Sequence, residues 1–184
     1  QSVDDPSDAR FSISAGYTSK DSANSAQDEG IFGKNAETAL LTEVAYGSPR
    51  WRVALAAAFK EGDWEDEYFT TADAHYRTDS TSETAIGLRG YWKPEDTGLV
   101  PAVQVGYDTT SIDNQDSGYA TEAAGWMIGL GWRDVILDGS KAGLAFGQRV
   151  HGTEIKGGGK DPAENGFSWE AYYSFKVSDN VTVT

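Results

Sequence analysis

The sequence predicts an all-β fold, an antiparallel up-and-down transmembrane β-barrel, and three patterns point to it. Apolar and polar residues alternate in nine short runs along the 184-residue chain, as they do in strands with two different faces. The connections between these runs are long and short in turn. Every charged residue within a run falls on one side of the alternation, so the other side carries no charge.

The alternating runs define the expected strands, because successive side chains of a strand point to opposite faces of its sheet. In chain order they cover residues 10–18, 39–47, 51–60, 83–92, 99–108, 126–133, 141–150, 167–177 and 181–184. The segment DEGIFGKNAETALL holds at most one helical turn, since Gly30 and Gly33 disfavour a longer helix. We therefore expect strands throughout.

The connections set the topology. The short ones read SPR, KPEDTG, DVILDGS and SDN, and they are rich in the turn residues Pro, Asp, Gly, Asn and Ser. The long ones follow residues 18, 60, 108 and 150. This alternation predicts a meander with all tight turns at one end of the sheet and all long loops at the other.

The apolar side of the alternation is uncharged in every run. In the run 51–60 it consists of Trp51, Val53, Leu55, Ala57 and Phe59. In the run 141–150 it includes Leu144, Phe146 and Val150. A charged side chain facing the middle of a bilayer costs roughly 2–4 kcal/mol. An uncharged row is therefore what lipid requires, and we expect these rows to face outward.

The opposite side carries small and charged residues, which leave room for water. The residues that we expect to line a lumen are Glu43, Arg52, Arg89, Gln104, Arg133, Arg149, Glu170 and Lys176. Several cations lie toward the short turns, namely Arg52, Arg89, Arg133, Lys141 and Lys176. They predict a basic ring at one mouth that favours anions, unless they are solvated or paired with Glu43 and Glu170.

Aromatic residues gather near both ends of the runs. The expected membrane girdle consists of Tyr46, Trp51, Trp92, Trp132 and Phe175 beside the short turns, and of Phe59, Tyr107, Trp126 and Trp169 beside the long loops. Aliphatic residues fill the middle. Two aromatic belts about one strand length apart are typical of the two membrane–water interfaces.

Other chemistries find little support. A net charge of −14 argues against nucleic acid as a partner, and the absence of cysteine excludes thiol catalysis. His75 and His151 have no further ligands at metal-binding spacing. In KGGGKDP, Asp161 stands where a phosphate-binding loop needs Ser or Thr. We expect no enzyme activity, no cofactor and no metal.

The long loops carry acidic and aromatic residues. The acidic residues are Asp28, Glu29, Glu61, Asp63, Glu65, Asp66, Glu67, Asp113 and Asp116. They form either a solvated rim, which we favour, or a functional surface, namely a vestibule that gathers cations or calcium bridges to lipid headgroups. The loop aromatic residues Trp64, Tyr68, Tyr76 and Tyr119 serve either to stack on sugars or to pack the loops.

Three segments resemble a known family. ETAIGLRGYWKPEDTGLVPAVQVGY, GWMIGLGWRDVILDGSKAGLAFGQ and FSWEAYYSFKVSDNVTVT are similar to the cyanobacterial outer-membrane porins of the S-layer-homology-anchored type, which are grouped with carbohydrate-selective porins. The resemblance runs from about residue 38 to the end. It implies a barrel of about sixteen strands, preceded by a domain that binds the cell wall and by a coiled coil.

The 184 residues contain neither of those preceding regions. We therefore expect residues 1–184 to be a single β-barrel segment, with the cell wall as a partner only through a region not found here. The number of alternating runs is odd, whereas bacterial single-chain barrels close with an even number of strands. The count therefore agrees with a segment of a larger barrel. The resemblance also implies a homo-oligomer, a trimer. Flat contacts between its subunits would be permitted by the small residues Gly90, Pro101, Ala142 and Ala171.

The expected function is that of an outer-membrane porin, a water-filled channel for passive diffusion of small solutes and inorganic ions, with outer-membrane lipid around it. Two alternatives remain open at this point. Alternation also occurs in soluble β-sandwich or barrel modules, for instance glycan-binding ones, whose apolar rows face inward. An outer-membrane barrel with a plugged lumen would serve mainly as an anchor.

Overall fold

The protein is an open, all-β sheet. The computed structural model describes residues 8–20, 23, 25–26, 30–31, 33, 36–62, 82–95, 98–113, 115–157, 167–178 and 181–184. Its strands are β1 (Arg10–Ser19), β2 (Thr38–Ser48), β3 (Trp51–Glu61), β4 (Ser82–Trp92), β5 (Ala102–Asp113), β6 (Ala120–Arg133), β7 (Lys141–Ile155), β8 (Ser168–Ser178) and β9 (Val181–Val183). Within these ranges the structure holds no helix of the length and apolar character that crossing a membrane requires.

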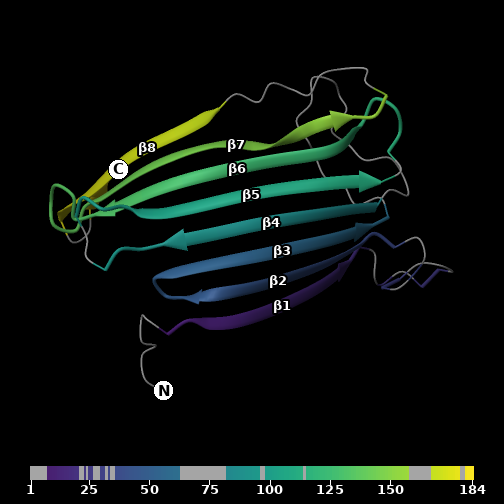
Figure 1. Ribbon diagram of the computed structural model, residues 1–184, viewed down its shortest axis with the longest axis horizontal. Helices are drawn as coiled ribbons and strands as arrows, with labels where there is room; N and C mark the ends of the chain where they lie inside the picture. The colour runs from purple at the N-terminus through teal and green to yellow at the C-terminus, as the bar shows by residue number, and fades with distance from the viewer. Residues whose placement is uncertain are drawn as a thin grey trace.

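The strands lie side by side in chain order, and every neighbouring pair is antiparallel. Figure 1 shows the turns β2–β3, β4–β5 and β6–β7 together at the left end of the sheet. The strand ends that lead into the long connections lie at the right. The predicted up-and-down meander is confirmed.

The sheet does not close into a barrel. β1 and β9 are its two edges, and no pairing joins them in the part of the chain that the structure describes. The first and ninth strands of a meander run in the same direction. Closing β1 against β9 would force a parallel pair into an antiparallel sheet, which an even strand number avoids.

Three strands extend well beyond their predicted bounds at the long-loop end. β5 reaches Asp113, β6 begins at Ala120 and β7 continues to Ile155. The added residues bury a small apolar cluster of Ile112, Ala120 and Ala123, with Val150 packed against it. Burial of apolar area stabilises these extensions. The sequence did not predict them because Asp and Ser in the same stretches are typical of loops. At its other end β5 begins only at Ala102, after Pro101, which has no N–H to give to the ladder.

The register aligns the apolar residues of all the long strands. One row of directly paired residues runs Phe11, Tyr46, Val53, Gly90, Val105, Ile128, Phe146 and Trp169. Residues of these rows are exposed, with 69% of Ile13, 53% of Leu55 and 44% of Ile86 accessible to solvent. The described strands thus do not gather their apolar rows into an interior.

The strands are also staggered. The row just described crosses β2 at Tyr46, near the short turn that joins β2 to β3, and it reaches β8 at Trp169, one residue after that strand begins. A row perpendicular to the strands therefore passes from one end of the sheet to the other. Such stagger accompanies the tilted strands of a barrel wall.

One residue predicted on the apolar face lies on the other face. The pairs Ala124–His151 and Trp126–Gln148 flank a register shift in which β7 carries one residue more than β6. A one-residue bulge exchanges the two faces beyond it. Val150 consequently turns toward Ile112 and Ala123, and its prediction as an outward residue is wrong.

Candidate functional site

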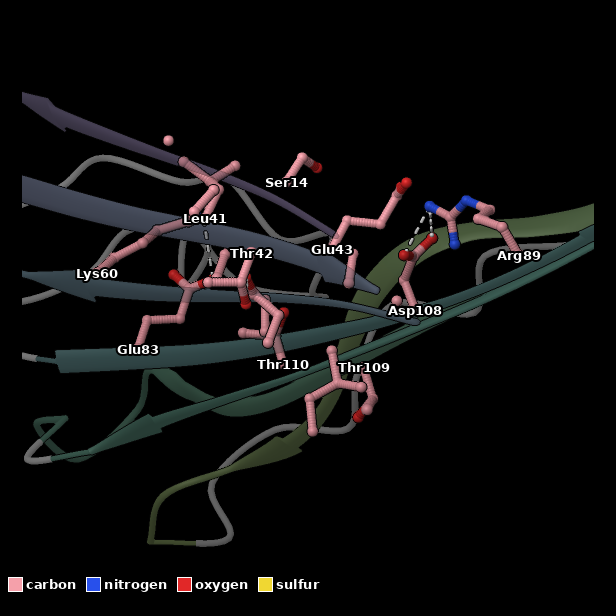
Figure 2. A pocket seen from close by; sticks show the side chains of 18 of the residues that line it. Ser14, Leu41, Thr42, Glu43, Lys60, Glu83, Arg89, Asp108, Thr109 and Thr110 are labelled. Carbon is pink, nitrogen blue, oxygen red and sulfur yellow. Dashed lines mark hydrogen bonds and ion pairs between the residues drawn. The ribbon is translucent and has the colours of Figure 1, made fainter. Parts of the chain in front are cut away.

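The polar face of the sheet is hollowed. A hollow of about 740 Å³ lies over β1 to β5 and also touches Val150 of β7, which shows how far the sheet curls around it. Figure 2 shows Ser14, Glu43, Lys60, Glu83, Arg89 and Asp108 around this space. Alanine and glycine fill much of the remaining lining. The short side chains leave the hollow open, and the charged side chains around it form ion pairs between strands.

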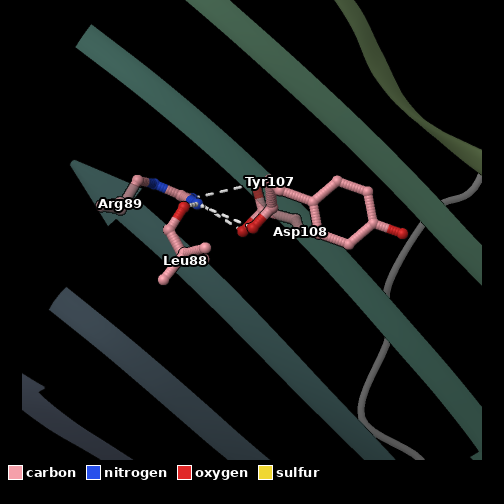
Figure 3. A network of polar contacts seen from close by, with 4 residues as sticks. All are labelled: Leu88, Arg89, Tyr107 and Asp108. Atoms are coloured by element: carbon pink, nitrogen blue, oxygen red, sulfur yellow. Dashed lines mark hydrogen bonds and ion pairs between the residues drawn. The ribbon is translucent and has the colours of Figure 1, made fainter. Parts of the chain in front are cut away.

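The first pair joins β4 and β5. Arg89 Nη2 lies 2.7 Å from Asp108 Oδ1, and Arg89 Nη1 donates to the carbonyl oxygens of Leu88 and Tyr107 at 3.2 and 3.3 Å (Figure 3). Gly87 makes room for it, because a Cβ there would lie 2.9 Å from Asp108 Oδ1. These contacts hold the guanidinium across the face, although half of the Arg89 side chain remains exposed to solvent.

The second pair is nearly buried. Lys60 on β3 stands directly opposite Glu83 on β4, with Nζ 3.1 Å from Oε1. Only 17% of the Lys60 side chain and 1% of the Glu83 side chain are exposed. Charges removed from water in this way are retained only when they are paired. The pair thus ties the long-loop ends of β3 and β4 together.

The third pair lies toward the short turns. Arg52 Nη2 is 2.7 Å from Glu43 Oε1, and both side chains are partly exposed, by 43% and 37%. Arg52 also donates to the hydroxyl of Ser12 on β1 at 3.5 Å. The pair spans β1, β2 and β3. Because it is open to solvent, its contribution to stability is about 0–1 kcal/mol.

The predicted lining residues fall into separate groups. Glu43, Arg52 and Arg89 form the pairs just described. Gln104 and Arg133 line a second hollow of about 390 Å³ nearer the short turns. Arg149 and Glu170 border a third hollow beside the bulge of β7. Lys176, on β8, is exposed and pairs in register with Thr182 of β9.

The structure changes the expected distribution of positive charge. Arg52 and Arg89 each face a carboxylate, so these two members of the predicted basic ring are neutralised. Lys60, Glu83 and Asp108 were not among the predicted lining residues, although they lie on the same side of the alternation. The direct opposition of Lys60 and Glu83 is set by the register of β3 against β4, which neither strand encodes alone.

The predicted girdle residues lie on the apolar face. Six of them are exposed by at least a third, namely Tyr46, Trp51, Phe59, Trp92, Tyr107 and Trp169. Trp126, Trp132 and Phe175 are partly exposed. The indole N–H of Trp132 donates to the carbonyl oxygen of Leu99 at 3.0 Å, which leaves the ring apolar toward its surroundings. Tyr46 and Trp51 meet edge to face with ring centroids 5.5 Å apart.

The described residues form no metal site, and much of the long loops lies outside them. In the described ranges no group of three or more His, Cys, Asp or Glu side chains could hold a metal ion. The Nδ1 atom of His151 lies 2.9 Å from the carbonyl oxygen of Arg149. Several residues from the loop hypotheses lie outside the described residues, namely Asp28, Glu29, Asp63, Trp64, Glu65, Asp66, Glu67, Tyr68, His75, Tyr76, Lys160 and Asp161.

Comparison with known proteins adds no family. No protein-family model, curated protein or solved structure matches the chain.

Proposed function

We propose that the chain is part of the wall of an outer-membrane porin, a transmembrane β-barrel of about sixteen strands. Its polar face lines a water-filled lumen through which small solutes and inorganic ions diffuse passively, without catalysis. The observation that carries this proposal is the contrast between the two faces. The apolar face is exposed along its whole width. Among the residues that the structure describes, the ion pairs Arg52–Glu43, Lys60–Glu83 and Arg89–Asp108 between strands lie on the hollowed face.

The exposed apolar face favours lipid as its surroundings. Contiguous apolar surface of this extent is rare on soluble monomers, whereas acyl chains cover it without penalty. The long strands have 10 to 15 residues, enough for the nine to eleven or so residues that a tilted membrane strand needs. The stagger of the rows agrees with such a tilt. The similarity of three segments to cyanobacterial porins supports the same interpretation.

The polar face favours a wet lumen. Arg52, Arg89 and Lys60 are held against carboxylates across a floor of alanine and glycine. Small side chains leave space for water, and fixed charges set selectivity without moving parts. The partners that follow are lipid, small ions and solutes, and further copies of the chain in a homo-oligomer such as a trimer. Cell-wall contact would belong to a region not found in these residues.

The test is electrical. In planar lipid bilayers, the purified full-length protein should produce stepwise increases of conductance. Ala56→Trp, which places a large ring on the hollowed face, should reduce the size of each step. Leu55→Trp, its neighbour on the apolar face, should leave the step unchanged and is the matched control.

Three results would contradict the proposal. Absence of steps from folded, membrane-inserted protein would favour a plugged anchor barrel. A protein that stays clear and monomeric in detergent-free buffer would favour a soluble binding module. Equal effects of the two tryptophan variants would show that residues 55 and 56 do not face lipid and lumen.

A further inference from the structure

The second hollow of the polar face differs from the first in its charge balance. It holds about 390 Å³ and lies near the short turns of β4–β5 and β6–β7. Three cations line it, Lys93, Arg133 and Lys141, together with the single carboxylate of Glu95. Glu95 is 80% exposed, and Arg50 lies 3.4 Å from it. The hollow therefore has an excess of positive charge, although the chain as a whole carries −14.

Two of the cations are forced together by the register. Arg133 of β6 is directly opposite Lys141 of β7 on the same face of the sheet. Directly opposed side chains have Cβ atoms only about 4.5–5.5 Å apart, so like charges there repel each other. No ion pair with either side chain occurs among the residues that the structure describes. By contrast, Arg52, Lys60 and Arg89 are all compensated.

The hollow offers suitable donors and space. The Arg133 guanidinium can donate two parallel hydrogen bonds to one oxyanion, and the ammonium of Lys141 adds a point charge. Lys93 is held at the rim, with Nζ 4.8 Å from the ring centre of Tyr91 and its backbone N–H bonded to the Arg50 carbonyl at 2.7 Å. At Gly131, in the lining, a Cβ would meet no atom within 4 Å.

We propose that this hollow is a binding site for a multivalent oxyanion of the phosphate class, held by Arg133 and Lys141 with Lys93 at the rim. A bound oxyanion bridges the two opposed cations and removes their repulsion. The consequence for transport, a local preference for anions on the lumen wall, rests on the proposed porin function. The binding itself does not, since it is a property of the folded sheet.

The experiment is a calorimetric titration of the full-length protein in neutral detergent with inorganic phosphate, at constant ionic strength adjusted with chloride. Wild type should bind saturably. Lys141→Gln should weaken binding by about tenfold or more, since it removes one charge-assisted contact. Gly131→Asp, which puts a carboxylate into the open space, should abolish binding. Arg52→Gln removes the same charge from a paired position and should retain binding within about twofold.

Circular dichroism spectra and heat-modified gel mobility report whether each variant is folded, so loss of binding is interpreted only for folded protein. No saturable binding to wild type, or an equal loss in Lys141→Gln and Arg52→Gln, would overturn the site. Competition by a short-chain phosphatidic acid would identify a lipid headgroup as the source of the phosphate. Lack of competition would identify the free ion. Because no step measures conductance, failure here is distinct from failure of the porin proposal.

Discussion

Replacing Leu55 by arginine should destabilise the membrane-inserted protein by roughly 2–4 kcal/mol, the cost of a cation on the lipid face near mid-membrane. Leu55 is in the middle of β3, and 53% of it is exposed. If that face met water instead, the same change would fall within about 0.5 kcal/mol, as most surface substitutions do. Urea unfolding of the full-length protein refolded into vesicles measures the difference.

The control for this variant is Ala56→Arg. Ala56 is the next residue of the same strand, lies over the hollow and stands directly opposite Glu43. An arginine there enters a wet, charged face, so its cost should be below about 1 kcal/mol. Similar unfolding free energies for the two arginine variants would contradict the assignment of the faces.

Replacing Glu83 by alanine should cost about 3 kcal/mol or more. The change leaves Lys60, whose side chain is only 17% exposed, without its carboxylate, and an uncompensated buried charge is among the largest penalties that a single substitution causes. Urea titration again provides the measurement. Glu61→Ala removes the same charge from an exposed neighbour of Lys60 and should change stability by less than about 0.5 kcal/mol.

The double variant Lys60→Ala/Glu83→Ala separates pairing from packing. If the two charges stabilise each other, the double variant should be less destabilised than the sum of the two single variants, with a coupling of about 1–3 kcal/mol. Additive effects would show that the Glu83 penalty arises from something other than loss of its contact with Lys60.

The strands and their faces were predictable from the sequence because a period of two is a strong local signal. In residues 51–60 each aliphatic or aromatic residue is followed by a small or charged one, and short connections such as SPR leave little freedom in register. The structure accordingly pairs Ser48 with Trp51 and aligns all later positions of β2 and β3.

The bulge and the strand extensions were not predictable in the same way. Val150 continues the apolar alternation of its run, and only one additional residue in β7 relative to β6 turns it toward Ile112. That mismatch depends on how two strands pair, which neither strand encodes alone. The ion pairs also depend on register, since Arg89 reaches Asp108 across two strands that have 18 residues between these positions. Closure of the sheet is a property of strand number and curvature together.

Spin labels test the central claim directly, namely that the apolar face contacts lipid and the polar face contacts water. The 184 residues contain no cysteine, so a cysteine introduced at residue 55 or 56 is the one attachment point within them. In vesicle-inserted full-length protein, a nitroxide at residue 55 should be relaxed by dissolved oxygen and protected from an aqueous nickel chelate. A nitroxide at residue 56 should respond in the opposite way. A label at residue 55 that responds to the nickel chelate, or that is immobile and inaccessible to both reagents, would contradict the account.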